Sequence, residues 1–347
     1  MTAAELRTSR QADGQGMRPS ATGEDGGPLF SALVKASAVC CALPERVSRW
    51  MAGALGLLVA HAWRHERERW RETIDRIYHR CRRPPPQPVE TIIEQGFLHF
   101  ALVIAEVLRF PAMTGEEFQA RVTFEGLEHL RAALAGGRGV VLAVPHLGNW
   151  ELLGGAIAHA GFPLHSFYMA QKEDDLGRAL DHFRQFTRIV LHDRDRGLVG
   201  ALKALKQGAI LGMMPDQDGG NHGVFLDFLG HWVSVPAGPA NWSLKTGAAV
   251  VPLYSWRCGH TGRFRARFLP ALPAETTGPM EERVISRTRR LVAWMEEVIL
   301  ALPHQYLWFY DRFKPRHHQH LARLKKAGVP MRGGGACLGL LPGEAGS

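Results

Sequence analysis

From Arg138 onward, short apolar runs of β-type composition alternate with helical segments, and this alternation restricts the possible folds more than any other feature. The expected strands are GVVLAVP, HSFYMA, RIVLHD, AILGMMP, AVVPLYSW and RFRARFLP, and the expected helices lie at 150–159, 174–187, 198–207 and 239–246. Continuous apolar strands separated by helices are typical of a parallel sheet covered on both faces. The sequence therefore predicts an α/β fold with a mixed, largely parallel sheet flanked by helices. We expect its last two strands, between residues 250 and 270, to form an antiparallel pair at the edge.

The segment before this domain has apolar runs that are too short to cross a bilayer. Residues 29–43 and 50–63 are separated by PERVSR, whereas a spanning helix needs about 20 apolar residues. The helical stretch that follows ends at PPPQP, which forms a stiff linker. We predict a disordered tail at 1–28, a membrane-associated helical anchor at 29–83, the main domain at 84–316 and a flexible basic, Gly-rich tail at 317–347. Two helices of a soluble core are the alternative for the apolar runs.

The positive charge is concentrated in two segments. Residues 64–83 contain eight Arg and four acidic residues, and residues 312–332 contain seven Lys or Arg and no acidic residue, against a net charge of +9 for the whole chain. Basic segments beside apolar ones suit an anionic membrane surface, where each cation contributes ~1 kcal/mol. No nucleic-acid recognition motif accompanies them, so we expect no nucleic-acid partner. The five cysteines have no CxxC spacing, which favours a reducing cytoplasmic environment over a disulfide framework or a zinc site.

A histidine and a glutamate follow the first apolar strand of this series, in VPHLGNWELLGG. Active sites of open α/β sheets lie at the carboxyl ends of strands, which is where this segment places His146. Residues five apart on one helix would point about 140° away from each other, so we expect His146 in the turn, Asn149 near the N-cap and Glu151 in the first helical turn. Glu151 would then accept a hydrogen bond from one nitrogen of His146, while the other nitrogen takes a proton from a hydroxyl group. A structural histidine beside a helix-start glutamate is the alternative.

Three segments in this order resemble the bacterial lipid A late acyltransferases, which belong to the wider group of glycerolipid acyltransferases. HLGNWE, at 146–151, is similar to their His-x4-acid motif, and residues 213–254 are similar to their DQD, GVF, F-x-G, GPA and L-x-TGA-x-VVP pattern. PHQYLWFYDRFKPR, at 303–316, is similar to their PEQYLW segment with its RFK-type ending. Two departures bear on the acceptor: His304 replaces the usual glutamate, and FYDR follows Trp308 in place of a histidine-led pattern.

The resemblance implies a glycerolipid-acyltransferase-like fold and transfer of an acyl chain from acyl-ACP or acyl-CoA to a hydroxyl group of a lipid A precursor or similar glycolipid, with no further cofactor and no metal. It implies that His146 is the base, that Glu151 is its orienting acid, and that an arginine some thirty residues further on assists binding or charge stabilisation. Arg184 is our first choice for that arginine, ahead of Arg178 and Arg188. The further substrate-binding candidates are Asn149, Asp216, Gln217, Gly223 and Phe225. We expect the catalytic domain on the cytoplasmic face of the inner membrane.

The sequence also allows other interpretations. Asp216, Gln217 and Asp218 follow the strand AILGMMP and so would reach the same sheet edge as His146. They would hold acceptor hydroxyls, organise a turn, or act as the DxD clamp of a metal-dependent glycosyltransferase. A non-catalytic lipid-binding protein is a further possibility. Related acyltransferases act on other glycolipids, including phosphatidylinositol mannosides, and on lysophospholipids. A metal site at HHQH, residues 317–320, is less favoured than an exposed basic tail.

Overall fold

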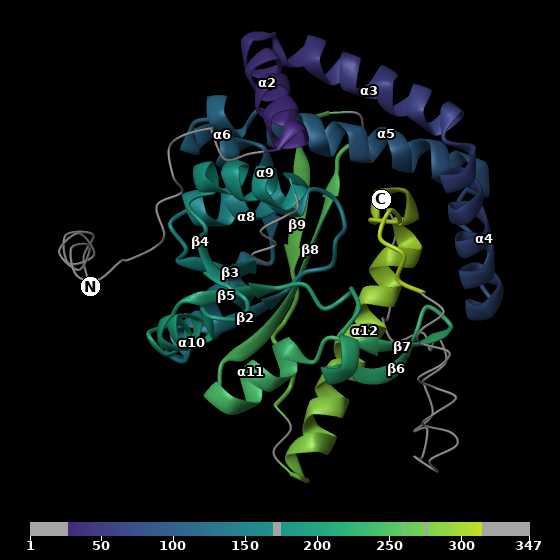
Figure 1. The fold of residues 1–347 in the computed structure, drawn as a ribbon. Helices are drawn as coiled ribbons and strands as arrows, with labels where there is room; N and C mark the ends of the chain where they lie inside the picture. The colour runs from purple at the N-terminus through teal and green to yellow at the C-terminus, as the bar shows by residue number, and fades with distance from the viewer. Residues whose placement is uncertain (1–26, 169–174, 260, 275–276, 314–347) are drawn as a thin grey trace.

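The computed structural model describes residues 27–168, 175–259, 261–274 and 277–313 (Figure 1). The predicted disordered tail lies almost wholly outside the described residues, and the predicted tail at 317–347, with its HHQH segment, lies wholly outside them.

Seven strands form one sheet in the order β1-β9-β8-β2-β5-β3-β4. All neighbouring strands pair in parallel except β8 and β9, which are antiparallel. The predicted α/β fold with a mixed, largely parallel sheet is therefore confirmed. The strands are β1 Val122–Glu125, β2 Val140–Ala143, β3 Leu164–Tyr168, β4 Val190–Asp193, β5 Ile210–Met213, β8 Ala249–Arg257 and β9 Phe264–Phe268.

The antiparallel pair is present, but its predicted place at the sheet edge is wrong. β8 lies between β9 and β2, and β9 is covered on its other side by β1. β1 has only four residues, VTFE, with a threonine and a glutamate among them. Because polar residues interrupt it, this strand has no continuous apolar run, so the pattern that identifies the other strands does not identify this one.

Helices cover both faces of the sheet, as the alternating residues of β2 show. Val140 and Leu142 pack in one core with α6, α7, α8 and α9, whereas Val141 and Ala143 pack in a second core with α4, α5, α10 and α12. Both faces of this strand are therefore buried, which explains its unbroken apolar sequence. These helices are α4 Arg64–Cys81, α5 Val89–Leu108, α6 Gly115–Ala120, α7 Leu127–Ala135, α8 Trp150–His159, α9 Asp175–Arg184, α10 Leu198–Lys206 and α12 Met280–Ala301.

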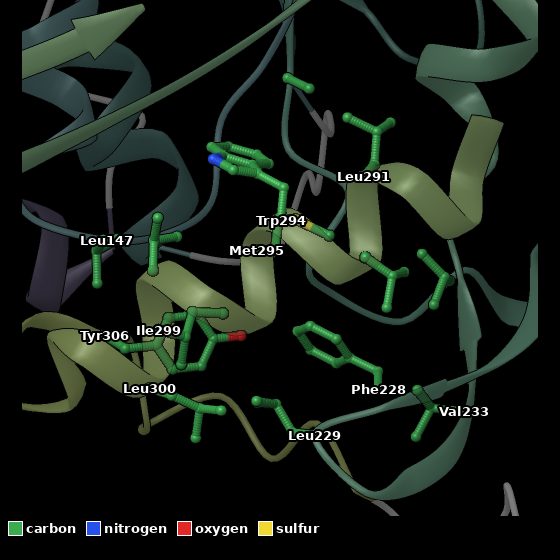
Figure 2. Close-up of a cluster of buried hydrophobic side chains, with 14 of the residues drawn as sticks. Leu147, Phe228, Leu229, Val233, Leu291, Trp294, Met295, Ile299, Leu300 and Tyr306 are labelled. Atoms are coloured by element: carbon green, nitrogen blue, oxygen red, sulfur yellow. The ribbon is translucent and has the colours of Figure 1, made fainter. Parts of the chain in front are cut away.

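A separate hairpin, β6 Val224–Phe228 and β7 His231–Val235, packs on α12. Figure 2 shows one buried cluster in which Phe228 and Val233 of the hairpin lie beside α12, and the same cluster joins Met295 and Ile299 of α12 with Leu147 and Tyr306. This core therefore supports the turn that carries His146. A helix of nine residues, α11 Gly238–Thr246, leads from the hairpin back to β8.

Two further helices, α2 Pro28–Ala42 and α3 Glu45–Ala62, lie with α5 at the top of the view in Figure 1. α3 runs along α5 and packs against it. In the part of the chain that the structure describes, α5 is the one helix long and apolar enough to cross a membrane, but most of it is buried inside the fold. It therefore gives only weak support to a membrane-inserted helix.

Candidate active site

The turn between β2 and α8 holds His146 at the carboxyl end of β2, where the sequence predicts it. Asn149 is the N-cap of α8, and its Oδ1 accepts a hydrogen bond of 3.0 Å from the backbone N of Leu152. Gly148 has φ +68°, and a Cβ there would collide with the backbone of Ser255 on β8. Glycine is therefore required at this position, because the turn approaches β8 closely in a left-handed conformation.

His146 is paired with Asp216, which follows β5. The ring Nδ1 of His146 lies 2.8 Å from Asp216 Oδ1, and the backbone N of His146 donates to Asp216 Oδ2, also at 2.8 Å. Burial alone raises the pKa of Asp216, but the charge of His146 and these hydrogen bonds hold it below its ordinary value. An ionised carboxylate accepts only, so Nδ1 carries the proton in this pair and Nε2 is left as the basic nitrogen.

The orienting role predicted for Glu151 is therefore wrong, because the acid bonded to His146 is Asp216. Glu151 instead forms a two-point ion pair with Arg184, with Nε–Oε2 at 2.9 Å and Nη2–Oε1 at 2.5 Å. Burial raises the pKa of Glu151, but Arg184 outweighs burial and holds that pKa below its ordinary value. The side chain of Glu151 thus reaches from the first turn of α8 to Arg184, the last residue of α9.

Arg184 is the arginine that the structure brings to this site. It also lies 3.2 Å from Asp181; burial lowers the pKa of its guanidinium, but Glu151 and Asp181 outweigh burial and hold that pKa above its ordinary value. The two rivals lie elsewhere. Arg178 pairs with Asp175, and Arg188 lines a different cavity beside His159 and α6.

The Nε2 side of the His146 ring is bounded by a polar group and an aromatic ring. The amide nitrogen of Gln217 lies 3.3 Å from Nε2, and the ring of Trp150 meets the imidazole edge to face with the centroids 5.0 Å apart. The side chain of His146 is 14% exposed, whereas that of Asp216 is fully buried. His146 thus presents one nitrogen to solvent or substrate while its partner is shielded.

Sequence reasoning did not single out Tyr306, which contacts this pair. Its hydroxyl is hydrogen-bonded to Asp216, and burial together with that carboxylate raises its pKa well above the ordinary value. A neutral hydroxyl next to a carboxylate donates to it, so Tyr306 adds a further donor to Asp216. The segment PHQYLW contains Tyr306, but the pattern alone does not indicate that its side chain reaches back to residue 216.

An apolar cavity of about 80 Å³ is lined in part by the Glu151–Arg184 pair. Its polar lining is supplied by Glu151, Arg184 and Ser166, and the remainder is almost wholly aliphatic, with Trp150 the one aromatic residue. It lies between α8 and the strands β2, β3 and β5. The lining includes Leu142, Val144, Leu153, Gly154, Ile157, Leu164, Ile189, Leu191, Met213, Met214 and Leu253.

The remaining candidates lie around the hairpin. Asp218 caps its own turn by accepting from Gly220 N at 2.9 Å, and its backbone N donates to the hydroxyl of Tyr310. Gly223 precedes β6, and Phe225 pairs with Ser234 across the hairpin. The substrate-binding roles of Asn149, Asp216, Gln217, Gly223 and Phe225 stay predictions.

The sequence did not predict the buried ion-pair network that lies behind the turn carrying His146. Glu106 of α5 accepts from Asn149 Nδ2 at 2.9 Å and from Arg49 Nη1 at 2.7 Å, and it pairs with both terminal nitrogens of Arg257. His99 Nε2 lies 3.1 Å from the carbonyl oxygen of Gly148, and burial together with Arg257 lowers its pKa to about 3, so this ring is neutral. A lone glutamate in the apolar helix LVIAEVL is the signal that would have indicated such a network.

Comparison with known proteins identifies a family for this chain. Residues 29–315 match the family model described as bacterial lipid A biosynthesis acyltransferase. The chain is 24% identical over 282 residues to the lipid A biosynthesis acyltransferase of Haemophilus influenzae, a match that covers 79% of this chain and 84% of that protein.

Two further relatives differ in the acceptor that their names give. The phosphatidylinositol mannoside acyltransferase of Mycolicibacterium smegmatis is 29% identical over 220 residues, covering 62% of this chain and 70% of that protein. The lipid A biosynthesis myristoyltransferase of Escherichia coli K12 is 24% identical over 228 residues, covering 65% of this chain and 69% of that protein.

Proposed function

The chain belongs to the bacterial lipid A biosynthesis acyltransferase family and is an acyltransferase, and on that premise we propose that it moves a fatty acyl chain from a thioester to a hydroxyl group of a glycolipid, with His146 as the general base. The observation that carries the proposal is the hydrogen bond of His146 Nδ1 to buried Asp216, which leaves Nε2 as the basic nitrogen, with the side-chain amide of Gln217 3.3 Å from it. This is the arrangement of a base held in one tautomer by a carboxylate.

In the proposed reaction, Nε2 of His146 removes the proton from the acceptor hydroxyl as its oxygen attacks the thioester carbonyl. The imidazolium that forms is stabilised by Asp216, which in turn accepts from Tyr306. Collapse of the tetrahedral oxyanion breaks the C–S bond, and the thiol leaves with the proton that His146 gives back. No acyl-enzyme intermediate is required.

The oxyanion needs a donor group that is in place before the reaction. Arg184 is already bonded to Glu151 and Asp181, so its charge is largely used by those two acids. We propose that the first backbone N–H groups of α8 support the oxyanion, since the N-terminus of a helix attracts negative charge. Arg184 then acts indirectly, by fixing Glu151 in the wall of the apolar cavity.

The apolar cavity supports the acyl chain as the transferred group. Its lining includes Trp150, whose ring contacts that of His146, and Glu151, and the rest lies between α8 and the sheet among aliphatic side chains. A saturated chain has the matching chemistry, because burial of each methylene contributes ≈ 0.8 kcal/mol. The donor that we propose is acyl-ACP or acyl-CoA, without a further cofactor.

Two acceptor classes are supported by the relatives, namely lipid A precursors and phosphatidylinositol mannosides. We propose a lipid A precursor or a related glycolipid, acylated at the cytoplasmic face of the inner membrane. His304, at the place of the family's usual glutamate, lies in the short helix η5 Pro303–Gln305 and is partly buried, with its Nε2 3.2 Å from the amide nitrogen of Gln305. This departure lies one residue from Gln305 and two from Tyr306, which joins the site through Asp216.

The alternative of a metal-dependent glycosyltransferase is disfavoured by the bonding of Asp216. Both of its oxygens already accept hydrogen bonds from His146, and the side chain is fully buried. A DxD clamp needs carboxylate oxygens that are open to the cation. Within the described ranges, no three His, Cys, Asp or Glu side chains are grouped as a metal site requires.

The test is transfer of radiolabelled acyl chains from acyl-ACP or acyl-CoA to lipid A precursor and to phosphatidylinositol mannoside by the purified full chain. We expect activity that survives a chelator, that forms no labelled protein adduct and that is lost in His146→Ala. Full turnover by His146→Ala would overturn the mechanism, and sugar transfer that a chelator abolishes would overturn the reaction class. Mass spectrometry of lipids from cells with and without the protein identifies the acceptor.

A further inference from the structure

α3 is packed with its small residues inward and its large apolar residues outward. Its buried positions are Ser48, Gly53, Gly56 and Ala60. A Cβ at Gly56 would lie 2.7 Å from the Cβ of Ala101 on α5, so the two helices are in close backbone contact. The exposed face carries large apolar side chains at helical spacing, namely Val47, Trp50, Met51, Leu55 and Leu58.

This exposed face, defined as the α3 stripe by Val47, Trp50, Met51, Leu55 and Leu58, is unusual for a surface in water. Trp50 is 74% exposed and Leu58 is 63% exposed. Contiguous exposed apolar residues mark sites of association with a protein or a membrane. A helix with such a face and flanking cations lies in the interface plane of a bilayer.

A basic cleft of about 530 Å³ opens at the N-terminal end of the α3 stripe. Its walls come from the start of α3, from α6 with the residue that follows it, and from the connection between β8 and β9. A Cβ at Gly262 would lie 2.8 Å from Glu45 Oε1 and 2.9 Å from Arg49 Nη1, so the walls converge at that glycine. The lining is Glu45, Arg46, Arg49, Glu117, Ala120, Arg121, Thr261, Gly262 and Arg263.

Both acids of the cleft already accept hydrogen bonds from neighbouring groups, whereas two of its arginines form no ion pair with a described residue. Glu45 binds Arg121 through both oxygens at 2.7 Å, and the side chain of Glu117 accepts from the N-cap backbone of α6. Arg46 and Arg263 are exposed and have no ion pair with any residue that the structure describes. The cleft therefore presents uncompensated positive charge to solvent, and Arg46 immediately precedes Val47 of the α3 stripe.

We propose that the basic cleft binds the phosphate of an anionic phospholipid while the α3 stripe inserts among the acyl chains of the same leaflet. The inference rests on the membrane association proposed above and adds a specific headgroup site to it. Continuity of charge and apolar surface favours a phospholipid: a free phosphate would use only the cleft, and an acidic protein would leave the α3 stripe exposed to water. Guanidinium groups suit this ligand because they bind phosphate oxygens in pairs.

The cleft is also connected to the active-site turn. Arg49, in its wall, pairs with Glu106, and the other oxygen of Glu106 accepts from Asn149 at the start of α8. A lipid held in the cleft therefore fixes the orientation of the active-site turn relative to the bilayer surface that supplies the glycolipid.

The test is flotation of the purified full chain with vesicles of phosphatidylcholine alone and of phosphatidylcholine mixed with phosphatidylglycerol. We expect Arg46→Gln/Arg263→Gln to lower partitioning on to the mixed vesicles about 25-fold, since each cation near the surface is worth about five-fold, and to leave binding to phosphatidylcholine unchanged. Trp50→Gln/Leu58→Gln should lower binding to both vesicles. The matched control is Arg131→Gln/Arg289→Gln, which removes the same charge from two exposed arginines outside the cleft and should lower binding far less.

Two outcomes would overturn the headgroup site. These are equal losses of mixed-vesicle binding in the cleft and control variants, and unchanged binding of the cleft variant to the mixed vesicles. Failure of the wild-type chain to bind either vesicle would overturn the membrane association itself. None of these measurements depends on turnover, so they are separate from the test of acyl transfer.

Discussion

Nδ1 of His146 lies 2.8 Å from Oδ1 of Asp216, two residues that are seventy positions apart in the chain and that follow the adjacent strands β2 and β5. Parallel pairing of these strands brings their carboxyl ends to the same edge of the sheet, and the two segments that leave them meet there. Asp216 is fully buried, so the proton on Nδ1 has an acceptor that water does not reach.

Asp216→Asn tests this relationship directly. The asparagine amide retains the shape but favours the tautomer with its proton on Nε2, so we expect kcat to fall ~10²- to 10⁴-fold with the fold retained. His146→Ala should lose ~10²-fold or more. Steady-state transfer rates and circular dichroism of both variants measure the effect. Wild-type turnover by Asp216→Asn would return the orienting role to Glu151.

Glu151→Gln should act differently, because Glu151 serves Arg184 and not His146. Removing its charge leaves the partly buried guanidinium with Asp181 as its remaining acid partner, which should destabilise the chain by ~2 kcal/mol and loosen the wall of the apolar cavity. Denaturant unfolding checks the loss of stability. A neutral effect on both stability and activity would contradict the ion-pair role. Glu128→Gln, on the exposed surface of α7, is the matched control.

The sequence predicts the local structure around His146 and Glu151, but it does not predict the partner of either residue. Local features, such as the strand, the turn, the Asn149 cap and the bounds of α8, follow from residues near one another in the chain, and the structure has them as predicted. Which acid meets His146 depends on the distance between β2 and β5 and on the position of Arg184, and these are set by tertiary packing. The same limit applies to β1, whose pairing with β9 joins segments more than a hundred residues apart.

Gly154 and Gly155 are neighbours on α8 that allow a test of whether the apolar cavity holds the acyl chain. A Cβ at Gly154 would lie 2.7 Å from Cδ1 of Ile189 in the cavity wall, whereas one at Gly155 would meet Phe118 in the core. Gly154→Ala should therefore push Ile189 into the cavity and lower transfer of palmitoyl chains more than that of lauroyl chains. Gly155→Ala should lower the melting temperature without changing that preference. Rates with donors of different chain length provide the measurement, and the same preference in both variants would contradict the assignment of the cavity.

Glu296 of α12 should make stability depend on pH. Burial raises its pKa to about 8, with Asp227 and Glu297 adding to the rise, while the hydrogen bond from Leu229 N and the charge of Arg83 oppose it. The folded state holds this proton more tightly than the unfolded state, so stability falls as pH rises between about 4.5 and about 8. Glu296→Gln should remove this loss and raise stability at pH 8 by up to ~4 kcal/mol, with little change at pH 5. Unfolding at both pH values measures it, and equal gains at the two values would contradict the assignment.

Glu106→Gln should show how far the active-site turn depends on the network behind it. Glu106 balances Arg49 and Arg257, and Arg257 is 6% exposed, so removing the carboxylate leaves uncompensated buried cationic charge. Breaking such a pair typically costs 3–5 kcal/mol. Because Asn149 also bonds to Glu106, the start of α8 should lose its fixed position, and kcat should fall more than the binding of vesicles. Glu94→Gln, on the exposed side of the same helix, removes the same charge without touching the network. If the two variants unfold at the same denaturant concentration, the network does not support the turn.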